Sequence, residues 1–147
     1  MGRLSPGGKG TKTGAFWELV IRPVLDIHYS GRFQTHVPVG RQLFGAAYYA
    51  DFVVRDDAGG IIVSAKWQQV RGTAEQKLLY EIASLISIIR NSDEYRKAYV
   101  VLGGTGFSGG ARSFLLRNDH RKVLADGHLV EVVSLEDFLS RANKGEL

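Results

Sequence analysis

The residue types best suited to chemistry lie in two neighbouring apolar segments, the first containing Asp51 and the second containing Lys66. Side chains on a strand alternate between its two faces, so Ser64, Lys66 and Gln68 share one face if the second segment is a strand. Pairing of the two segments then brings a carboxylate beside an ammonium, a hydroxyl and an amide. Such a group can bind a hard cation and stabilise a negatively charged transition state; a plain ion pair between Asp51 and Lys66 is the alternative.

The composition limits which metal such a site can hold. The chain has no cysteine, which excludes disulfides, thiolate metal sites and cysteine nucleophiles. Its four histidines show neither HxxxH nor HExxH spacing, so a zinc hydrolase site is not expected. Oxygen ligands, and with them a magnesium-like cation, are therefore predicted.

The elements that must position these residues are predicted from the same stretch. YYADFVVR and IIVSAKWQ are joined by DDAGG, whose aspartates and glycines favour a tight turn, so the two segments are predicted to form a hairpin. A helix is predicted to follow from Thr73, with Gln76 at the capping-box position. Its apolar stripe consists of Leu78, Leu79, Ile82, Leu85, Ile86 and Ile89.

The remaining segments complete an α/β pattern. Ala15–Ile27 shows the near four-residue apolar spacing of a helix, and RFQTHVPVG is predicted to be a strand. KAYVVLG has the continuous apolar character of a strand covered on both faces. HLVEVVS is a further strand candidate, and a last helix is predicted to begin at Ser134. This order predicts an α/β fold with a central mixed β-sheet flanked by helices.

At 147 residues the chain is predicted to form one domain over residues 15–147, preceded by a flexible basic arm over residues 1–14. No apolar run approaches the roughly 20 residues that a membrane span needs, and the first residues lack the apolar stretch of a secretory signal. The expected location is the cytoplasm or the nucleoid, for a protein of cellular, phage or mobile-element origin. No membrane partner is expected.

The hairpin motif resembles that of the PD-(D/E)XK nuclease superfamily, in which an acid on one strand is followed, on the next strand, by acid-x-Lys. Asp51 matches the first acid and Ser64-Ala65-Lys66 matches the second part, with Ser64 where the family usually has its second acid. Ala50 stands where the family often has proline. The resemblance spans roughly residues 15–102, because the order αβββαβ also matches the restriction-endonuclease-like core of that superfamily.

The resemblance leaves one metal ligand to be found, because Ser64 is not an acid. Some members of the superfamily have SxK and supply the acid from the following helix, where Glu81 is favoured here and Glu75 is the alternative. Either glutamate can instead belong to a solvated helix face. Glu18 is a third candidate, since junction resolvases of this superfamily place a glutamate on their first helix after a KG-containing start, as in KGTKTGAFWE.

The resemblance also implies roles for these residues. The catalytic group would comprise Asp51, Ser64, Lys66 and Gln68, and Mg²⁺, for which Mn²⁺ substitutes, would be held by Asp51, the carbonyl of Ala65 and either Glu18 or Glu81. Lys66 would orient or deprotonate the attacking water and stabilise the transition state. Gln68 would position water or phosphate, because in related nucleases a glutamine follows the lysine by two.

The net charge of +4 favours a polyanionic partner, and DNA is the one that the resemblance implies. A mildly basic surface that only keeps the protein soluble is the alternative. Basic residues lie where turns or loops are expected, and we predict that they contact phosphates: Lys9, Lys12, Arg32, Arg41, Arg71 and Arg112.

The sequence therefore predicts a Mg²⁺-dependent DNA endonuclease. The favoured form is a Holliday junction resolvase acting as a homodimer, because cutting both strands of a junction calls for two sites. The alternatives are a restriction or homing endonuclease that cuts duplex DNA, and a catalytically inactive DNA-binding module of the same fold. Nucleotide binding is a further alternative, from the GxGxxG of Gly104, Gly106 and Gly109; no βαβ unit is predicted after it, so no nucleotide cofactor is expected.

Overall fold

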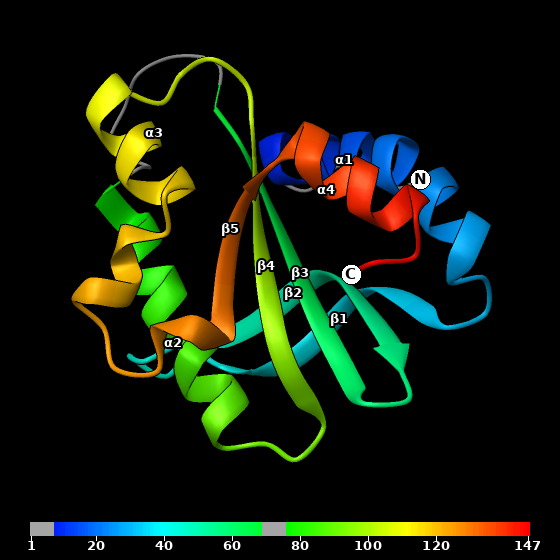
Figure 1. The fold of residues 1–147 in the computed structure, drawn as a ribbon, viewed down its shortest axis with the longest axis horizontal. Helices are drawn as coiled ribbons and strands as arrows, with labels where there is room; N and C mark the ends of the chain where they lie inside the picture. Colours follow the sequence, from blue (N-terminus) through cyan, green and yellow to red (C-terminus); the bar gives the residue numbers. More distant parts are fainter. Residues whose placement is uncertain (1–7, 69–75) are drawn as a thin grey trace.

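The structure, a computed structural model, describes residues 8–68 and 76–147, and these residues build one five-stranded β-sheet with helices on both faces (Figure 1). The bounds of the elements are α1 Gly8–His28, β1 Phe33–Arg41, β2 Ala47–Asp56, β3 Gly59–Trp67, α2 Leu78–Arg90, β4 Tyr95–Gly103, α3 Gly109–Leu116, β5 Val130–Ser134 and α4 Leu135–Asn143, with the short 3-10 helices η2 Asp119–Lys122 and η3 Gly127–Leu129.

The strands lie in the sheet in the order in which they occur in the chain, β1-β2-β3-β4-β5. The first three strands pair antiparallel, whereas β3, β4 and β5 pair parallel. Helices α1 and α4 cover one face, and α2 with α3 covers the other (Figure 1). The predicted α/β fold with a mixed sheet flanked by helices is therefore confirmed.

Burial explains why these segments adopt these elements. Strand β4 is buried along its apolar stretch on both faces, as its uninterrupted run of hydrophobic residues predicts. Helix α2 turns an apolar stripe toward the sheet, although Leu79 of the predicted stripe is exposed. The predicted start of this helix at Thr73 lies outside the described residues. Ser134 accepts a hydrogen bond from the Asp137 amide and caps α4, as predicted.

Helix α1 begins earlier than its apolar spacing indicates. It starts at Gly8, so residues 8–14, which we predicted to belong to a flexible arm, are the first turns of this helix. Extending an existing helix adds about one backbone hydrogen bond per residue, which outweighs the weak helix propensity of this stretch. Pro23 lies inside the helix without ending it. Among the described residues, no helix is both long and apolar enough to cross a bilayer.

An irregularity crosses the sheet at Asp51. Residues two apart on a regular strand share a face, yet Ala50 packs in the buried cluster beneath α2, while Phe52 packs in the cluster beneath α1 and α4. On β1 the facing residue His36 has a left-handed φ of 52°. The pairing of β2 with β3 extends only to Phe52↔Val63, whereas β3 continues to pair with β4. The sheet therefore forks beside Asp51.

Candidate active site

Asp51 lies at the fork between β2 and β3. Its Oδ2 atom accepts a hydrogen bond of 2.7 Å from the backbone amide of Ala65. At this point the ladder between the two strands has ended, so the side chain takes the place of a backbone carbonyl and satisfies a donor of β3. The carboxylate of Asp51 is thereby fixed against the strand that carries Lys66.

The electrostatics of Asp51 favour a positive charge beside it. The pKa of Asp51 is raised above its ordinary value, chiefly because burial disfavours the ionised form and also because the carboxylate of Glu81 is nearby. The Ala65 amide, Lys66 and His36 act in the opposite direction and offset only part of this shift. A bound cation would offset the free-energy cost of burying the charge of Asp51 and would reduce its repulsion from Glu81.

Lys66 and Ser64 meet Glu81 on the face of the sheet that α2 covers. The Nζ atom of Lys66 lies 2.8 Å from Oε2 of Glu81, and the Ser64 hydroxyl donates to the same oxygen at 2.8 Å. Glu81 stands in the first turn of α2 and points down to the strand. The structure thus places a carboxylate from the helix beside the position where the motif lacks its second acid.

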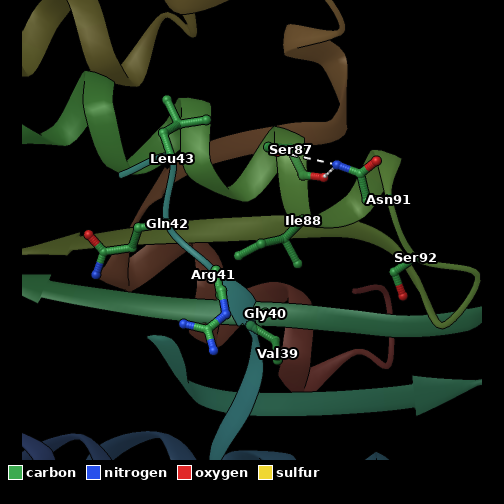
Figure 2. A pocket seen from close by; sticks show the side chains of 9 residues that line it. All are labelled: Val39, Gly40, Arg41, Gln42, Leu43, Ser87, Ile88, Asn91 and Ser92. Atoms are coloured by element: carbon green, nitrogen blue, oxygen red, sulfur yellow. Dashed lines mark hydrogen bonds between the residues drawn. The ribbon is translucent and has the colours of Figure 1, made fainter. Parts of the chain in front are cut away.

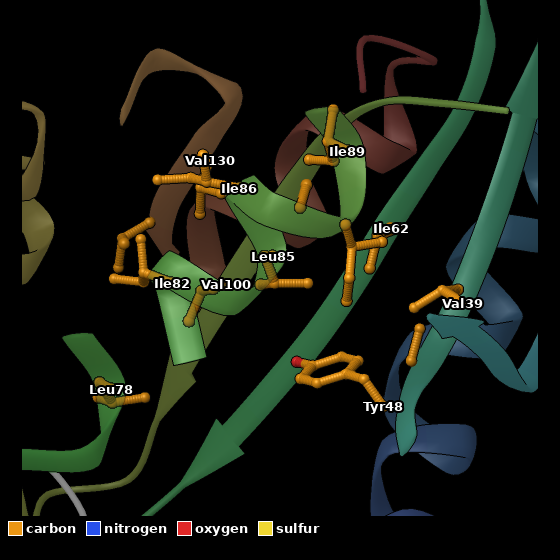
Figure 3. Close-up of a cluster of buried hydrophobic side chains, with 14 of the residues drawn as sticks. Val39, Tyr48, Ile62, Leu78, Ile82, Leu85, Ile86, Ile89, Val100 and Val130 are labelled. Carbon is orange, nitrogen blue, oxygen red and sulfur yellow. The ribbon is translucent and has the colours of Figure 1, made fainter. Parts of the chain in front are cut away.

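Tyr48 completes this group and was not predicted to belong to it. Its hydroxyl oxygen lies 2.5 Å from Oε2 of Glu81 and 2.7 Å from the Ser64 hydroxyl. The ring is 6% exposed and packs with Ile62 and Leu85 in the cluster beneath α2 (Figure 3). Burial, with Glu81 beside it, raises the pKa of Tyr48, so this hydroxyl keeps its proton and can donate it in a hydrogen bond.

The ring of Tyr48 lies in the core, where an aromatic residue of a half-buried strand is expected. The hydroxyl of a buried tyrosine requires a hydrogen-bond partner. Glu81 is an acid on the helix that is expected to cover this strand, so it is a candidate for that partner. That requirement is the one signal in the sequence that connects the two residues.

Two other predicted site residues lie apart from this group. Glu18 pairs with Arg22 one turn further along α1, at 3.7 Å, and both side chains are about half exposed. The amide nitrogen of Gln68 donates to the carbonyl of Gly106 at 3.0 Å. Glu75, the nearer alternative to Glu81, lies outside the described residues.

Gln68 also explains one of the glycines that follow β4. The Gly106 amide donates to the backbone carbonyl of Gln68 at 2.5 Å. Gly104 has a φ of 89°, and a Cβ atom there would lie 2.4 Å from that same carbonyl oxygen. Close packing against the residue after β3 thus accounts for one glycine of the GxGxxG pattern, Gly104, without a bound nucleotide.

The basic residues predicted to contact DNA do not form a single cluster among the residues whose side chains are described. Arg32 precedes β1 and donates to the carbonyl of His28 at 2.6 Å, whereas Arg41 ends β1 and donates to that of Gly45 at 2.8 Å. Arg112 lies on α3. Lys9 and Lys12 fall in the first turns of α1, where side chains are not described, and Arg71 lies outside the described residues.

The donor atoms of this site suit a hard cation with few protein ligands. In the described part of the chain, no three metal-ligating side chains gather at one place. Asp51 and Glu81 each use one carboxylate oxygen for the contacts above, and Ala65, whose amide is bonded to Asp51, also carries a backbone carbonyl oxygen. Mg²⁺ is often held by one or two carboxylates and keeps several of its waters, so this oxygen set fits it.

Comparison with known proteins identifies the family to which this chain belongs. A family model described as the PD-(D/E)XK nuclease superfamily domain matches residues 9–146. No curated protein gives a significant match. A crystal structure described as a protein of unknown function is similar at 12% sequence identity with a TM-score of 0.45, over 83% of this chain and 56% of that one. The chain thus spans little more than half the length of that protein.

Proposed function

Because the chain belongs to the PD-(D/E)XK nuclease superfamily, we propose that it is a nuclease, and specifically a Mg²⁺-dependent endonuclease acting on DNA. One observation carries the proposal: Lys66 and Glu81 are joined at 2.8 Å beside the strand position that fixes Asp51. Glu81, and not Glu18, supplies the second acid, since Glu81 contacts Ser64 and Lys66 directly.

The residues of the site have separate tasks in this proposal. Asp51, Glu81 and the carbonyl of Ala65 would hold the cation, which supplies charge neutralisation and a more acidic water when bound. The ammonium of Lys66 orients the attacking water and stabilises the negative charge that develops on the phosphate. Ser64 holds Glu81 in place. Gln68 supports the glycine loop, because its amide is bonded to Gly106.

We further propose that the substrate is a branched junction cut by a homodimer, since incision of both strands requires two sites. Cleavage of linear duplex, as by a restriction or homing endonuclease, is the second candidate. An inactive DNA-binding module is a third, and one observation favours it: Ser64 stands in place of an acid, and Lys66 already neutralises the glutamate that replaces it.

Cleavage assays distinguish these candidates. With Mg²⁺, the protein is expected to cut a labelled four-way junction at defined positions and a linear duplex of the same sequence more slowly. Chelation of the metal with EDTA should stop cleavage, and added Mn²⁺ should restore it, because the donors are oxygens. Preferential cutting of the linear duplex favours the second candidate. Salt-sensitive binding without cleavage in either metal establishes the inactive module.

Tyr48→Phe is expected to weaken the response to Mg²⁺ by about tenfold to a hundredfold, the usual effect of losing a partner that orients a metal ligand. The ring and its packing are retained, and only the hydroxyl beside Glu81 is lost. The measurement is the Mg²⁺ concentration that gives half-maximal cleavage, together with Mn²⁺ binding by calorimetry. Tyr49→Phe is the matched control, because Tyr49 is 52% exposed on the same strand. Equal metal responses in the two variants would refute this role for Tyr48.

A further inference from the structure

The loop between β1 and β2, residues 42–46, presents large apolar side chains to solvent. Phe44 is 90% exposed and Leu43 is 50% exposed. Burial of a phenylalanine side chain is strongly favourable, so a ring left open to water is a candidate for contact with a partner. A single exposed ring does not identify that partner, and the way this loop is built is more informative.

Helix α2 anchors the loop through two hydroxyl groups. The Leu43 amide donates to the Ser84 hydroxyl at 3.1 Å, and the Phe44 amide donates to the Tyr80 hydroxyl at 3.0 Å. Tyr80 and Ser84 stand one turn apart on the helix. The ring of Phe44 also lies against that of Tyr80, with centroids 4.8 Å apart. The backbone beneath the exposed ring is therefore fixed to a core helix.

Further bonds close the loop from within. The Gln42 amide donates to the carbonyl of Ala46 at 2.7 Å, and the Gly45 amide donates to that of Gln42 at 2.9 Å. Arg41 donates to the carbonyl of Gly45 at 2.8 Å, and Gly45 has a φ of 102°, which favours glycine. A loop constrained in this way has little conformational entropy left to lose on binding.

The loop lies next to the proposed cutting site. Tyr80 directly precedes Glu81 on α2, and the chain leaves the loop into Tyr48, whose hydroxyl contacts Glu81. Figure 2 shows Leu43 over α2, where it helps to line a pocket with Ser87, while the Arg41 side chain projects away from that helix. The loop thus carries an aromatic ring on its α2 side, against Tyr80, and a guanidinium that projects away from α2 and is bonded to the Gly45 carbonyl.

We propose that Phe44 stacks on an unpaired or unstacked base of the DNA substrate, with Arg41 contacting a neighbouring phosphate. This inference rests on the proposed function. A base offers a flat π-face that the exposed ring of Phe44 can cover, and a phosphate complements Arg41 and the net charge of +4. A second copy of the chain fits less well, because one phenylalanine and one leucine supply far less than the roughly 1,000 Å² that a stable interface buries.

The test measures DNA binding without cutting. Asp51→Asn serves as the background, and the probe is a four-way junction with 2-aminopurine at the branch point, whose fluorescence reports on base stacking. Phe44→Ala is expected to weaken binding about tenfold and to remove the fluorescence change, and Phe44→Trp is expected to retain both. Val123→Ala is the matched control, since Val123 is an exposed apolar residue, at 64%, outside this loop.

The possible failures are distinguishable. If the wild-type protein cuts the junction and Phe44→Ala binds it as tightly as Val123→Ala does, the stacking inference is overturned while the proposed function stands. If Phe44→Ala alters only the sedimentation of the protein and not its affinity for DNA, a second copy is the partner and the inference is again overturned. If the wild-type protein neither binds nor cuts DNA, the proposed function itself fails.

Discussion

Asp51→Asn is expected to reduce DNA cleavage by more than about a hundredfold, because the change removes a ligand of the cation, and loss of an outer partner alone typically costs 10-fold to 100-fold. The amide oxygen of asparagine can still accept the hydrogen bond that the Ala65 amide now gives to Asp51. The fork in the sheet is thus preserved while the negative charge is removed. Single-turnover cleavage of a junction substrate measures the effect.

The same variant should not be less stable than the wild type in the absence of metal. Burial raises the pKa of Asp51, so this group contributes stability below its unfolded-state pKa, and that contribution is lost as pH rises through the folded-state value. Asparagine does not ionise. The free energy of unfolding of Asp51→Asn should therefore equal or exceed that of the wild type at neutral pH, measured by urea denaturation with EDTA.

Asp57→Asn is the matched control for this prediction, because Asp57 is an exposed residue in the turn of the same hairpin. It should cleave as the wild type does. A large loss of stability in Asp51→Asn would mean that the aspartate is a structural residue, and undiminished cleavage would remove it from the proposed site.

Lys66→Met is expected to lower the maximal cleavage rate by roughly a hundredfold to a thousandfold, the usual cost of losing one group that stabilises transition-state charge. Methionine approximates the length of the lysine stem, and Glu81 keeps its contacts with Ser64 and Tyr48, so the site should remain folded. The loss should fall on kcat and leave the affinity for DNA nearly unchanged. Single-turnover kinetics together with equilibrium binding separate the two quantities.

Lys144→Met is the control for loss of one positive charge, because Lys144 is exposed beyond the end of α4. If Lys66→Met weakened DNA binding as much as it slowed cleavage, the lysine would be a phosphate contact and not a part of the chemistry. Circular dichroism of both variants establishes that their folds are intact.

The hairpin could be predicted because its information is local. The DDAGG turn sets the pairing of β2 with β3, and strand alternation then places Ser64 and Lys66 on one face. Glu81 was favoured over Glu75 only through the resemblance. What places it in the structure is the packing of α2 on the sheet, since that packing decides which side of the helix faces Lys66.

Other features depend on contacts that no local pattern encodes. Alternation predicts Gln68 beside Lys66, yet its amide is bonded to a glycine loop 38 residues further along the chain. The break in alternation at Asp51 involves both β1 and β2, including a left-handed His36, and a regular two-residue period cannot anticipate it. The start of α1 at Gly8 reflects extension of a helix whose apolar stripe begins only at Phe16.

The bond between Asp51 and the Ala65 amide gives one side chain two duties, closing the end of a strand ladder and facing the proposed ion. A change in ligation at the other carboxylate oxygen would therefore reach the main chain of β3 directly, without any intervening side chain. Replacement by the longer glutamate would have to shift either the strand or the ligand. The architecture of the sheet and the proposed chemistry of the site cannot be altered independently at that position.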